Sequence, residues 1–547
     1  MHHIFFVLEI LETILELADK QTQARCAQVC RRWSDVALNL LWAEISTVRD
    51  LFSILSPYKY KVRETSPFEF ATHPRRVNWL SFESYSRRVR RISLPANFSL
   101  HLYDAILDGF CRTRPHDIHF FPRLHTLTWP VSYTGSATYP LIFMHKNLTR
   151  LTLSIASDPD EDVAYDYVCP FFDDVAWRVP LLTHLEIQTK SIDEDDLPEF
   201  RNATTELIQG LTRLECLTIP PFWMTGAMLE KLSSVENLRE IHVGSAKVFG
   251  IEFEYTEFTP TFSIGSFSSL VVLELSIDFP NAIRLVGLQS FSANIKTFCI
   301  QSPICEPPLR VRVLLAAMNS KFPRIEKFLL HSCDLVTNHA DAGTAPAESI
   351  VELVHLQPVY AFRNLVHFEI RHPYPLGLDQ NDIEEIASEL PSTVELLVLN
   401  DDPTLFRSGT QLTLLAILPF ARHLPHLKVL GLFMDAVAID GLVVQDPPCF
   451  KNLEKLVVGV SDVAGHREVG MYLSKLLMFS SCCEIQARSQ ITTAEPIARI
   501  KRWQPMNELL PLLTAARREE ASKRSAFQRE AELLQRIRVL EEGLSRR

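Results

Sequence analysis

The sequence predicts an α/β protein with a short N-terminal helical motif, then an irregular solenoid of alternating strands and helices, and finally a C-terminal helix. Three observations favour this fold class. A strand-like apolar phrase recurs thirteen times, segments with helical spacing separate the phrases, and the first 45 residues follow a different apolar pattern. The predicted segments are 1–45, the helical motif; 46–85, a connecting segment; 86–480, the solenoid; 481–515, a C-terminal cap or linker; and 516–547, a short coiled-coil-like helix.

The recurring phrase is an apolar residue, two variable residues, an apolar residue, one variable residue and a third apolar residue. Successive phrases start 24 to 40 residues apart, at Val89, Leu124, Leu148, Leu182, Leu214, Leu238, Leu270, Ile295, Ile325, Leu365, Val394, Leu427 and Leu453. The last two apolar positions have the period of two that places both side chains on one face of a strand. The residues between them should face the other side: Thr128, Thr152, Glu186, Thr218, His242, Glu274, Cys299, Glu369, Val398, Gly431 and Val457.

Segments with helical spacing lie between the strand phrases. We expect helices at 194–211, 228–238, 311–318, 383–390, 412–421 and 469–478. Proline often ends such a segment just before the next strand, because its ring excludes helical geometry from the preceding residue. Examples are Pro122, Pro180, Pro323, Pro391 and Pro425.

On these phrases, residues 86–480 resemble an irregular leucine-rich-repeat protein. The resemblance implies one strand and one helix per repeat, with a sheet face that can bind another protein. Regular repeats of this family carry an asparagine after the strand, and this chain has no consistent counterpart. Uniform curvature is therefore not expected. An ordinary multi-domain α/β protein with coincidental phrases is the alternative interpretation.

The first 45 residues predict three short helices. In the first helix Ile10, Leu11, Ile14 and Leu17 should share one face, and Glu9, Glu12 and Glu16 the other. So short a segment cannot bury all of its apolar surface by itself. We therefore expect a partner protein or the adjoining solenoid to cover part of it.

This segment resembles the F-box, the adaptor-binding motif of ubiquitin-ligase receptors. The matching residues are Glu9-Ile10-Leu11 with Ile14, the phrase Val29-Cys30-Arg31-Arg32-Trp33, then Ala37-Leu38 and Leu41-Trp42. Many F-boxes open with Leu-Pro, where this chain has Phe6-Val7. The missing proline removes a rigid first-turn residue, which could weaken adaptor binding.

The resemblance implies that the N-terminal helices bind a Skp-type adaptor and, through it, a cullin. The residues expected to contact the adaptor are Phe6, Val7, Ile10, Leu11, Ile14, Val29, Cys30, Trp33 and Trp42. The solenoid would then bind a protein substrate of unknown identity. The protein is thus predicted to be a non-catalytic substrate receptor of a cullin-RING ubiquitin ligase. The rival is a leucine-rich-repeat scaffold outside any ligase, with the N-terminal helices capping the solenoid.

Composition and motifs argue against several other classes of function. A net charge of −11 does not favour nucleic acid as a partner, and no apolar run has the roughly 18 residues that a membrane span needs. Eleven irregularly spaced cysteines suggest reduced thiols and a cytoplasmic or nuclear location. Phosphate-binding, metalloprotease and hydrolase motifs are absent from the sequence, so we expect no catalytic residue, no cofactor and no metal.

The C-terminal segment changes character. Leu533, Ile537, Leu540 and Leu544 have 4-3-4 spacing, which predicts a short coiled-coil seam of about two heptads. Such a seam could support weak self-association or dock on a partner. A single frayed surface helix is the alternative, because two heptads are marginal on their own.

Overall fold

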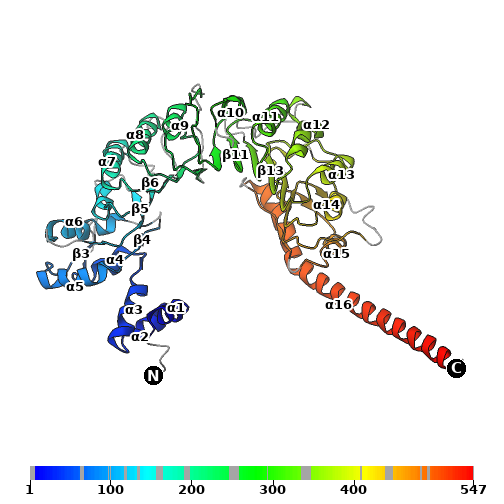
Figure 1. Ribbon diagram of the computed structural model, residues 1–547, viewed down its shortest axis with the longest axis horizontal. Coiled ribbons are helices and arrows are strands. Elements are labelled where there is room, and N and C mark those ends of the chain that lie inside the picture. The colour runs from blue at the N-terminus through cyan, green and yellow to red at the C-terminus, as the bar shows by residue number, and fades with distance from the viewer. Residues whose placement is uncertain are drawn as a thin grey trace. The chain divides into compact units, whose positions relative to one another are not determined.

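The computed structural model describes residues 7–61, 67–95, 98, 100–115, 120–131, 136–155, 164–189, 197–244, 258–291, 294–333, 347–406, 409–437, 447–480, 483–489 and 493–545. The chain divides into two compact units, Met1–Ser276 with Ser290–Ser292, and Ile277–Gln289 with Ala293–Arg547. In each unit parallel strands alternate along the chain with helices (Figure 1).

The first unit contains a parallel sheet with strand order β1-β4-β5-β6-β7-β8-β9-β10. These strands are β1 Glu44–Ile45, β4 Arg91–Ser93, β5 Thr126–Val131, β6 Arg150–Ile155, β7 His184–Thr189, β8 Cys216–Ile219, β9 Glu240–Val243 and β10 Val272–Leu275. The helices are α1 Leu8–Glu16, α2 Lys20–Cys26, α3 Arg31–Leu41, α4 Val48–Phe52, α5 Arg76–Ser86, α6 Asp104–Thr113, α7 Ala164–Arg178, α8 Leu197–Gly210 and α9 Gly226–Leu232. A separate antiparallel pair joins β2 Tyr58–Tyr60 to β3 Phe68–Phe70.

The second unit repeats this arrangement with strand order β11-β12-β13-β14-β15-β17-β19. Its strands are β11 Thr297–Ser302, β12 Lys327–Ser332, β13 His367–Arg371, β14 Leu396–Leu399, β15 Val429–Leu432, β17 Lys455–Val457 and β19 Glu484–Gln486, with a small parallel pair of β16 Asp435–Ala436 and β18 Asp462–Val463. Its helices are α10 Phe279–Gly287, α11 Pro308–Lys321, α12 Leu353–Leu356, α13 Gln380–Glu389, α14 Leu418–His423, α15 His466–Leu476 and α16 Ala494–Ser545.

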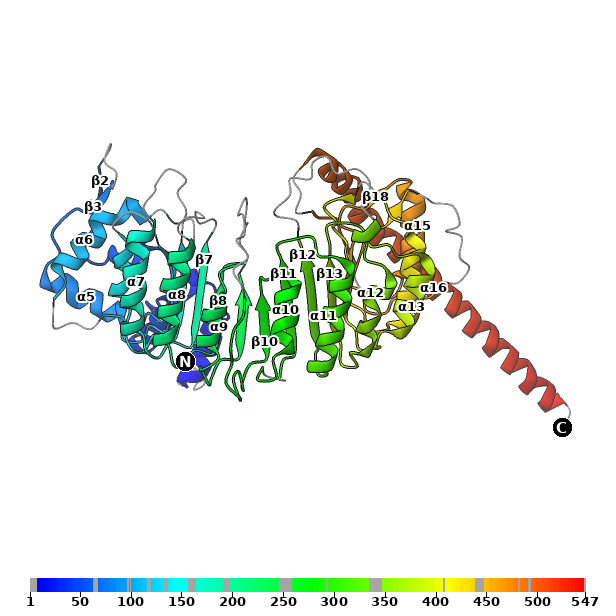
Figure 2. The same cartoon turned by 90° about the horizontal axis from the view of Figure 1, so that it is seen from above.

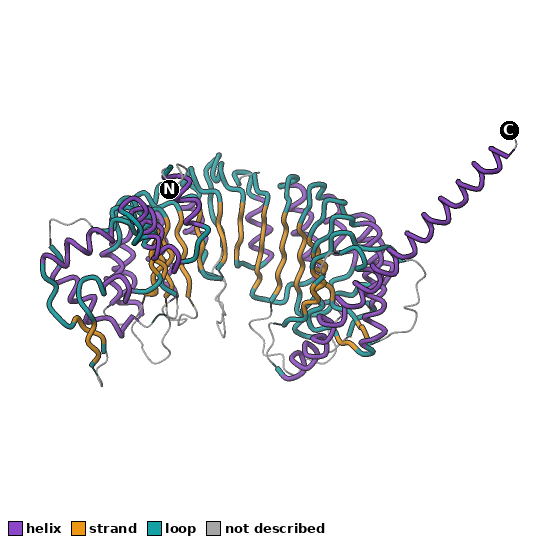
Figure 3. Tube along the Cα trace, turned by 90° about the horizontal axis from the view of Figure 1, so that it is seen from below, coloured by secondary structure: helices purple, strands orange, loops and turns teal. Residues whose placement is uncertain are grey.

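Each of the thirteen sequence phrases contains a strand of one of these two sheets, so the predicted fold class is confirmed. Consecutive helices pack beside one another along one face of the sheet within each unit, as α7, α8 and α9 do in the first (Figure 2). The strands lie side by side within each unit (Figure 3), and their pairing is parallel. One strand and one helix therefore form the repeating layer.

The strand register stacks the middle apolar residue of each phrase on that of the next. In the first unit this row is Ile92, Leu127, Leu151, Leu185, Leu217, Ile241 and Leu273, all 1% exposed or less. In the second unit the row begins with Phe298, Phe328 and Phe368 and continues with Leu397, Leu430, Leu456 and Ile485. Burial of these side chains against the helices supplies the main stabilisation of each layer.

The predicted helices at 228–238 and 412–421 differ most from the structure, whereas those at 311–318, 383–390 and 469–478 differ by three residues or fewer at each end. The helix expected at 228–238 ends at Leu232, because the hydroxyls of Ser233 and Ser234 donate to the carbonyls of Glu230 and Lys231. The segment 412–421 starts with a 3-10 turn at Leu414–Ile417, and α14 begins only at Leu418. Pro419 in the first turn of α14 has no N–H to continue a preceding helix.

The segments before residue 86 and after residue 480 also contain helices and strands. Residues 46–85, predicted as a connecting segment, contain α4, the β2–β3 pair and α5, and Phe52, Trp79 and Phe82 pack around Phe110. At the other end α16 crosses position 516 without a break.

The first turns of α16 belong to the core of the second unit. Trp503, Met506 and Leu510 are buried, and the Trp503 indole N–H donates to the carbonyl of Ser461 at 3.0 Å. The side chains of the predicted seam Leu533, Ile537, Leu540 and Leu544 lie outside the described residues, so that seam stays a prediction. Within the described ranges, no helix has the length and apolar composition needed to cross a membrane.

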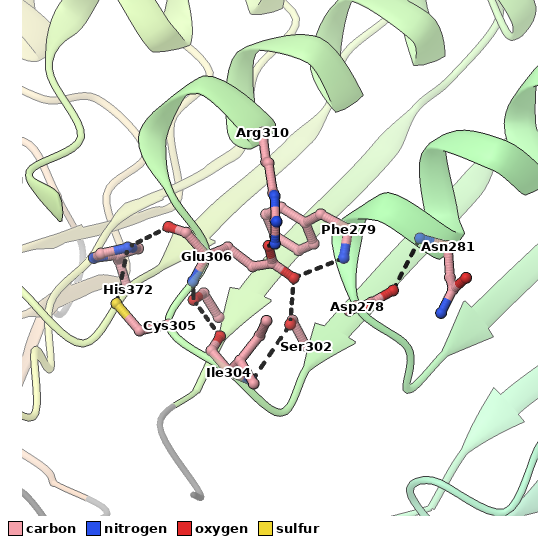
Figure 4. Close-up of polar contacts among 10 residues, drawn as sticks. Asp278, Phe279, Asn281, Ser302, Ile304, Cys305, Glu306, Arg310 and His372 are labelled. Atoms are coloured by element: carbon pink, nitrogen blue, oxygen red, sulfur yellow. Dashed lines mark hydrogen bonds and ion pairs between the residues drawn. The ribbon is translucent and has the colours of Figure 1, made fainter. Parts of the chain in front are cut away.

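Buried polar groups close the strand ends in the second unit (Figure 4). The carboxylate of Glu306 accepts hydrogen bonds from the Phe279 backbone N–H and the Ser302 hydroxyl, both at 2.7 Å, and lies 3.2 Å from the Arg310 guanidinium. The Ser332 hydroxyl accepts from the Glu306 N–H at 2.9 Å. Burial raises the pKa of Glu306 in spite of these hydrogen bonds.

Asn400 closes the next turn of the same unit. It follows β14 with a positive φ of 53°, and its amide accepts from the His372 backbone N–H at 3.0 Å and donates to the Tyr374 carbonyl at 2.7 Å. Asn400 directly follows β14, which is the position that asparagine occupies in regular leucine-rich repeats. At other strand ends of this unit, the hydroxyls of Ser302 and Ser332 and the Glu306 carboxylate make the hydrogen bonds instead.

Substitution of Asn400 by alanine should destabilise the second unit by about 1–3 kcal/mol, because the His372 N–H loses its buried acceptor. Alanine would also have to adopt the left-handed backbone conformation of Asn400. Amide hydrogen exchange of β13 and β14 measures the effect. The matched control is Asn452→Ala, since Asn452 also donates to a carbonyl, that of Pro425, but from an exposed position. Equal effects of both substitutions would contradict this role for Asn400.

Candidate functional site

The N-terminal helices α1, α2 and α3 build a small core of their own. Leu11 and Leu15 of α1 pack against Val36 and Ala37 of α3. Gln23 of α2 is buried, and its amide donates to the carbonyls of Leu15 at 2.8 Å and Ala18 at 3.1 Å. These bonds join α2 to the end of α1, where the Leu15 carbonyl also accepts the Ala18 backbone N–H at 3.1 Å. The three helices are thus held together by an apolar cluster and by the hydrogen bonds of the buried Gln23 side chain.

A second apolar face of α1 is left exposed. Ile10 and Ile14 of α1 and its two cap residues, Val7 and Leu17, follow 3-4-3 spacing, which places them along one side of the helix. In chain order, their exposed fractions are 43%, 37%, 42% and 87%. We call these four residues the N-terminal stripe. Because the core of the helices uses Leu11 and Leu15, the stripe is not needed to fold them.

The structure sorts the residues that the sequence predicts for adaptor contact. Val7, Ile10, Ile14, Val29 and Cys30 are exposed, and Leu11 is fully buried. The burial of Leu11 does not favour its contact with an adaptor, and Leu11 does not share an exposed face with Ile10 and Ile14, contrary to the helical spacing of the sequence. Phe6 lies outside the described residues.

The two tryptophans of the predicted set are half-buried within the first unit. Trp33 packs against the N-terminal core, and the Trp42 ring lies 4.8 Å from that of Tyr85 in α5. Leu17 is the most exposed member of the stripe, and the predicted contact set left it out. Leu17 follows Ile10 by seven residues and Ile14 by three, and this helical spacing is the sequence signal that would place Leu17 in the contact set.

Direct contacts tie the N-terminal helices to the sheet of the first unit. β1 begins three residues after α3 ends and pairs in parallel with β4, with Glu44 opposite Arg91. The Arg88 guanidinium donates to the Asp35 backbone carbonyl at 3.1 Å and lies 2.9 Å from its carboxylate, and it also donates to Asn39. The N-terminal helices are therefore joined to the sheet without a free linker.

The sheet face opposite the helices is chemically mixed. In the first unit the Thr152 hydroxyl donates to the Glu186 carboxylate at 3.1 Å, and the residues predicted between the strand apolar positions are partly exposed. In the second unit Cys299, Val398, Gly431 and Val457 are instead buried. Those four positions do not offer the exposed binding surface that the alternation of side chains predicts.

Glu369 is the centre of a charged cluster on β12 and β13. Its carboxylate lies 3.1 Å from the His331 ring and 3.6 Å from the His367 ring, and it also pairs with Arg371. Burial by itself would raise the pKa of Glu369, but the hydrogen bond from His331, the nearby His367 ring and the charge of Arg371 outweigh it and lower that pKa. Arg371 also lies 3.1 Å from the buried Asp401 carboxylate.

Cys305 and His372 lie close together but lack the arrangement of a catalytic pair (Figure 4). Their Sγ and Nε2 atoms are 3.8 Å apart. His372 Nε2 donates to the Glu306 carbonyl at 3.0 Å, and Nδ1 accepts from the Tyr374 N–H at 3.2 Å. Both ring nitrogens are thus used by the backbone. Burial lowers the pKa of His372, which favours the neutral, structural imidazole.

An N-terminal helical domain followed by a parallel-strand repeat solenoid is the class of architecture that this structure defines. Residues 8–47 match the F-box-like family, so the chain contains an F-box-like domain there, as the sequence resemblance indicates. No curated protein matches the sequence.

Several solved structures are similar at low sequence identity. The crystal structure of the Rad7 and Elc1 complex in yeast matches with 15% identity and a TM-score of 0.37, over 66% of this chain and 82% of that chain. The TLR13–ssRNA13 complex matches with 13% identity and a TM-score of 0.35, over 74% and 51%. An internalin from Listeria monocytogenes matches with 12% identity and a TM-score of 0.31, over 73% and 91%. At such TM-scores these likenesses carry no argument about function.

Replacing Gln23 by alanine should destabilise the F-box-like domain by about 1–3 kcal/mol, because the Ala18 carbonyl loses the Gln23 amide as donor and the Leu15 carbonyl keeps only the Ala18 N–H. Hydrogen exchange of the amides in α1 and α2 reports the loss. Gln28→Ala provides the control, since Gln28 is exposed. Unchanged protection in the Gln23 variant would show that the buried amide does not hold these helices together.

Proposed function

We propose that the protein is the substrate-recognition subunit of a Skp-cullin-F-box type ubiquitin ligase. The N-terminal helices bind a Skp-type adaptor, the adaptor binds a cullin, and the solenoid binds a target protein. The observation that carries this proposal is the exposed N-terminal stripe on the F-box-like domain at residues 8–47. The protein is non-catalytic in this role and raises the effective concentration of its target near the transfer machinery.

The stripe has the chemistry of a docking surface for an apolar groove. Four apolar side chains lie along one helical line, and Val29, in the turn before α3, is also 53% exposed. An amphipathic helix that presents residues at such spacing is a recurring means of binding a partner. Removing these side chains from water on binding contributes roughly 25 cal/mol per Å² of apolar area.

The rival function is a repeat scaffold in which the N-terminal helices only cap the solenoid. The pairing of β1 with β4 and the bonds of Arg88 to α3 fit a capping role. A cap, however, stabilises an array by burying its apolar side chains against the first repeat. The N-terminal stripe remains exposed, which favours adaptor binding over a role in capping alone.

The proposed target is a protein, because the chemically mixed sheet face suits a protein surface. Partly exposed Thr152, Glu186 and Gln188 offer hydrogen-bonding groups in the first unit. The proposed location is cytoplasmic or nuclear, as the sequence predicts. Weak self-association through the C-terminal helix is an additional prediction.

The double substitution Ile10→Arg and Ile14→Arg tests the adaptor role. Both side chains are exposed, so the folded protein should tolerate the change, while two charges on the stripe should reduce adaptor binding by at least about a hundredfold, or roughly 3 kcal/mol. The measurement is titration of the purified full-length protein with a Skp-type adaptor, with circular dichroism as the test of folding.

The control is Leu80→Arg, which places a charge on a similarly exposed apolar residue of α5. Point variants are sharper than deletion of residues 1–45, because that deletion would also remove β1 from the sheet. Absence of adaptor binding by the folded wild-type chain would overturn the ligase role. Equal binding by wild type and the double variant would show that the stripe is not the contact surface.

A further inference from the structure

One cluster in the first unit has the donor chemistry of a metal site. Among the described residues, Cys216, Glu240 and His242 are the one group of three such side chains whose possible ligand atoms all lie within 4.8 Å of one another. They come from neighbouring strands, with Cys216 at the start of β8 and the other two in β9. Neither the fold nor the proposed ligase role requires this combination.

Strand register explains why the three side chains meet. Cys216 is directly opposite Glu240 in the β8–β9 pair, and Thr218 is opposite His242. Leu217 and Ile241 are buried beneath the helices, so by alternation the three donors lie together on the other face of the sheet. All three are at least partly exposed, which leaves the cluster accessible to an ion from solution.

Glu274 on β10 supports the cluster from the next strand. Its Oε1 atom lies 3.2 Å from His242 Nδ1, and its Oε2 atom accepts the backbone N–H of Val243 at 3.1 Å. A carboxylate that accepts the Nδ1 proton fixes the imidazole so that Nε2 is available to a metal. Nε2 is the atom that faces Glu240, at 3.1 Å from its carboxylate.

We propose that Cys216, Glu240 and His242 bind one divalent metal ion of the zinc class. A thiolate, an imidazole and a carboxylate are the donor types that zinc accepts, whereas calcium and magnesium prefer oxygen ligands alone. Donors around a tetrahedral zinc ion are about 3.5 Å apart, so the side chains need to close by only about an ångström. Three protein donors leave the fourth position to water.

Binding must compete with a proton on His242. In the metal-free protein a hydrogen bond with Cys216 and the contacts with Glu274 and Glu240 outweigh burial and raise the pKa of His242 to about 11. The same two carboxylates that hold this proton would surround a divalent cation, whose larger charge they favour more strongly. The proposal does not depend on adaptor binding, because the four residues lie in β8, β9 and β10.

The test uses the full-length protein, stripped with a chelator and then dialysed against zinc ions. Wild type should bind one zinc equivalent that Cys216→Ser and His242→Gln each lose. With cobalt ions, wild type should show a thiolate-to-metal charge-transfer band that Cys216→Ser abolishes. Glu274→Gln should keep the stoichiometry but weaken the affinity by roughly 10–100-fold, as for other residues that orient a ligating histidine.

Matched controls are Cys111→Ser and His125→Gln, which remove an exposed cysteine and an exposed histidine elsewhere in the first unit. Both should retain the zinc equivalent. The same zinc stoichiometry in Cys216→Ser as in wild type, or a cobalt complex without the thiolate band, would overturn the proposal and leave an ion-pair network on the sheet. Should His242→Gln fail to fold by circular dichroism, Glu240→Gln carries the same test from a half-exposed position.

Discussion

The in-register pairing of parallel strands is the constraint on which the rest of this structure depends. Each strand offers one buried apolar row to the helices and one row to the opposite face, and the period of two couples the two rows. A slip of one residue between β8 and β9 would turn Leu217 and Ile241 out of the core and bring polar neighbours into it. Burial of the apolar row therefore also decides which polar side chains meet on the other face, including Cys216 and Glu240.

Strand register alone does not provide hydrogen-bond partners for the backbone groups at the strand ends. The repeats differ in length, so different backbone groups are left there without ladder partners. Buried N–H and C=O groups need partners in every repeat. Asn400 supplies them for one turn of the second unit, whereas Ser332 and Glu306 do so for others. An irregular set of short polar side chains can thus do locally what a repeated asparagine does in a regular array.

Thirteen strands were predictable because each phrase has the apolar period of two of a strand. This local pattern can be recognised without knowing which strands pair with it. β1 and β19 were missed because each contributes a single buried apolar residue, Ile45 or Ile485, and only pairing with β4 or β17 makes it a strand. The sequence identified the N-terminal segment as the site, but it did not show which of its residues are exposed and which are buried. Helical spacing cannot say whether Leu11 or Ile10 faces the core, since that depends on where Val36 and Ala37 of α3 pack. The cluster of Cys216 with His242 was invisible for the same reason, because repeat spacing and register bring its members together.

The absence of a free linker after α3 has a consequence for the proposed receptor. β1 pairs with β4, and Arg88 bonds to both the backbone and the side chain of Asp35, and the F-box-like domain and the sheet belong to the same compact unit. For a flexible linker, the effective concentration of a bound target falls as the linker lengthens. In the proposed receptor, the effective concentration of a target bound on this sheet would depend on the folded geometry of the first unit instead. A target bound on that sheet would be held at a defined distance from the N-terminal stripe, and a change in the position of its binding surface would alter its presentation without altering its affinity.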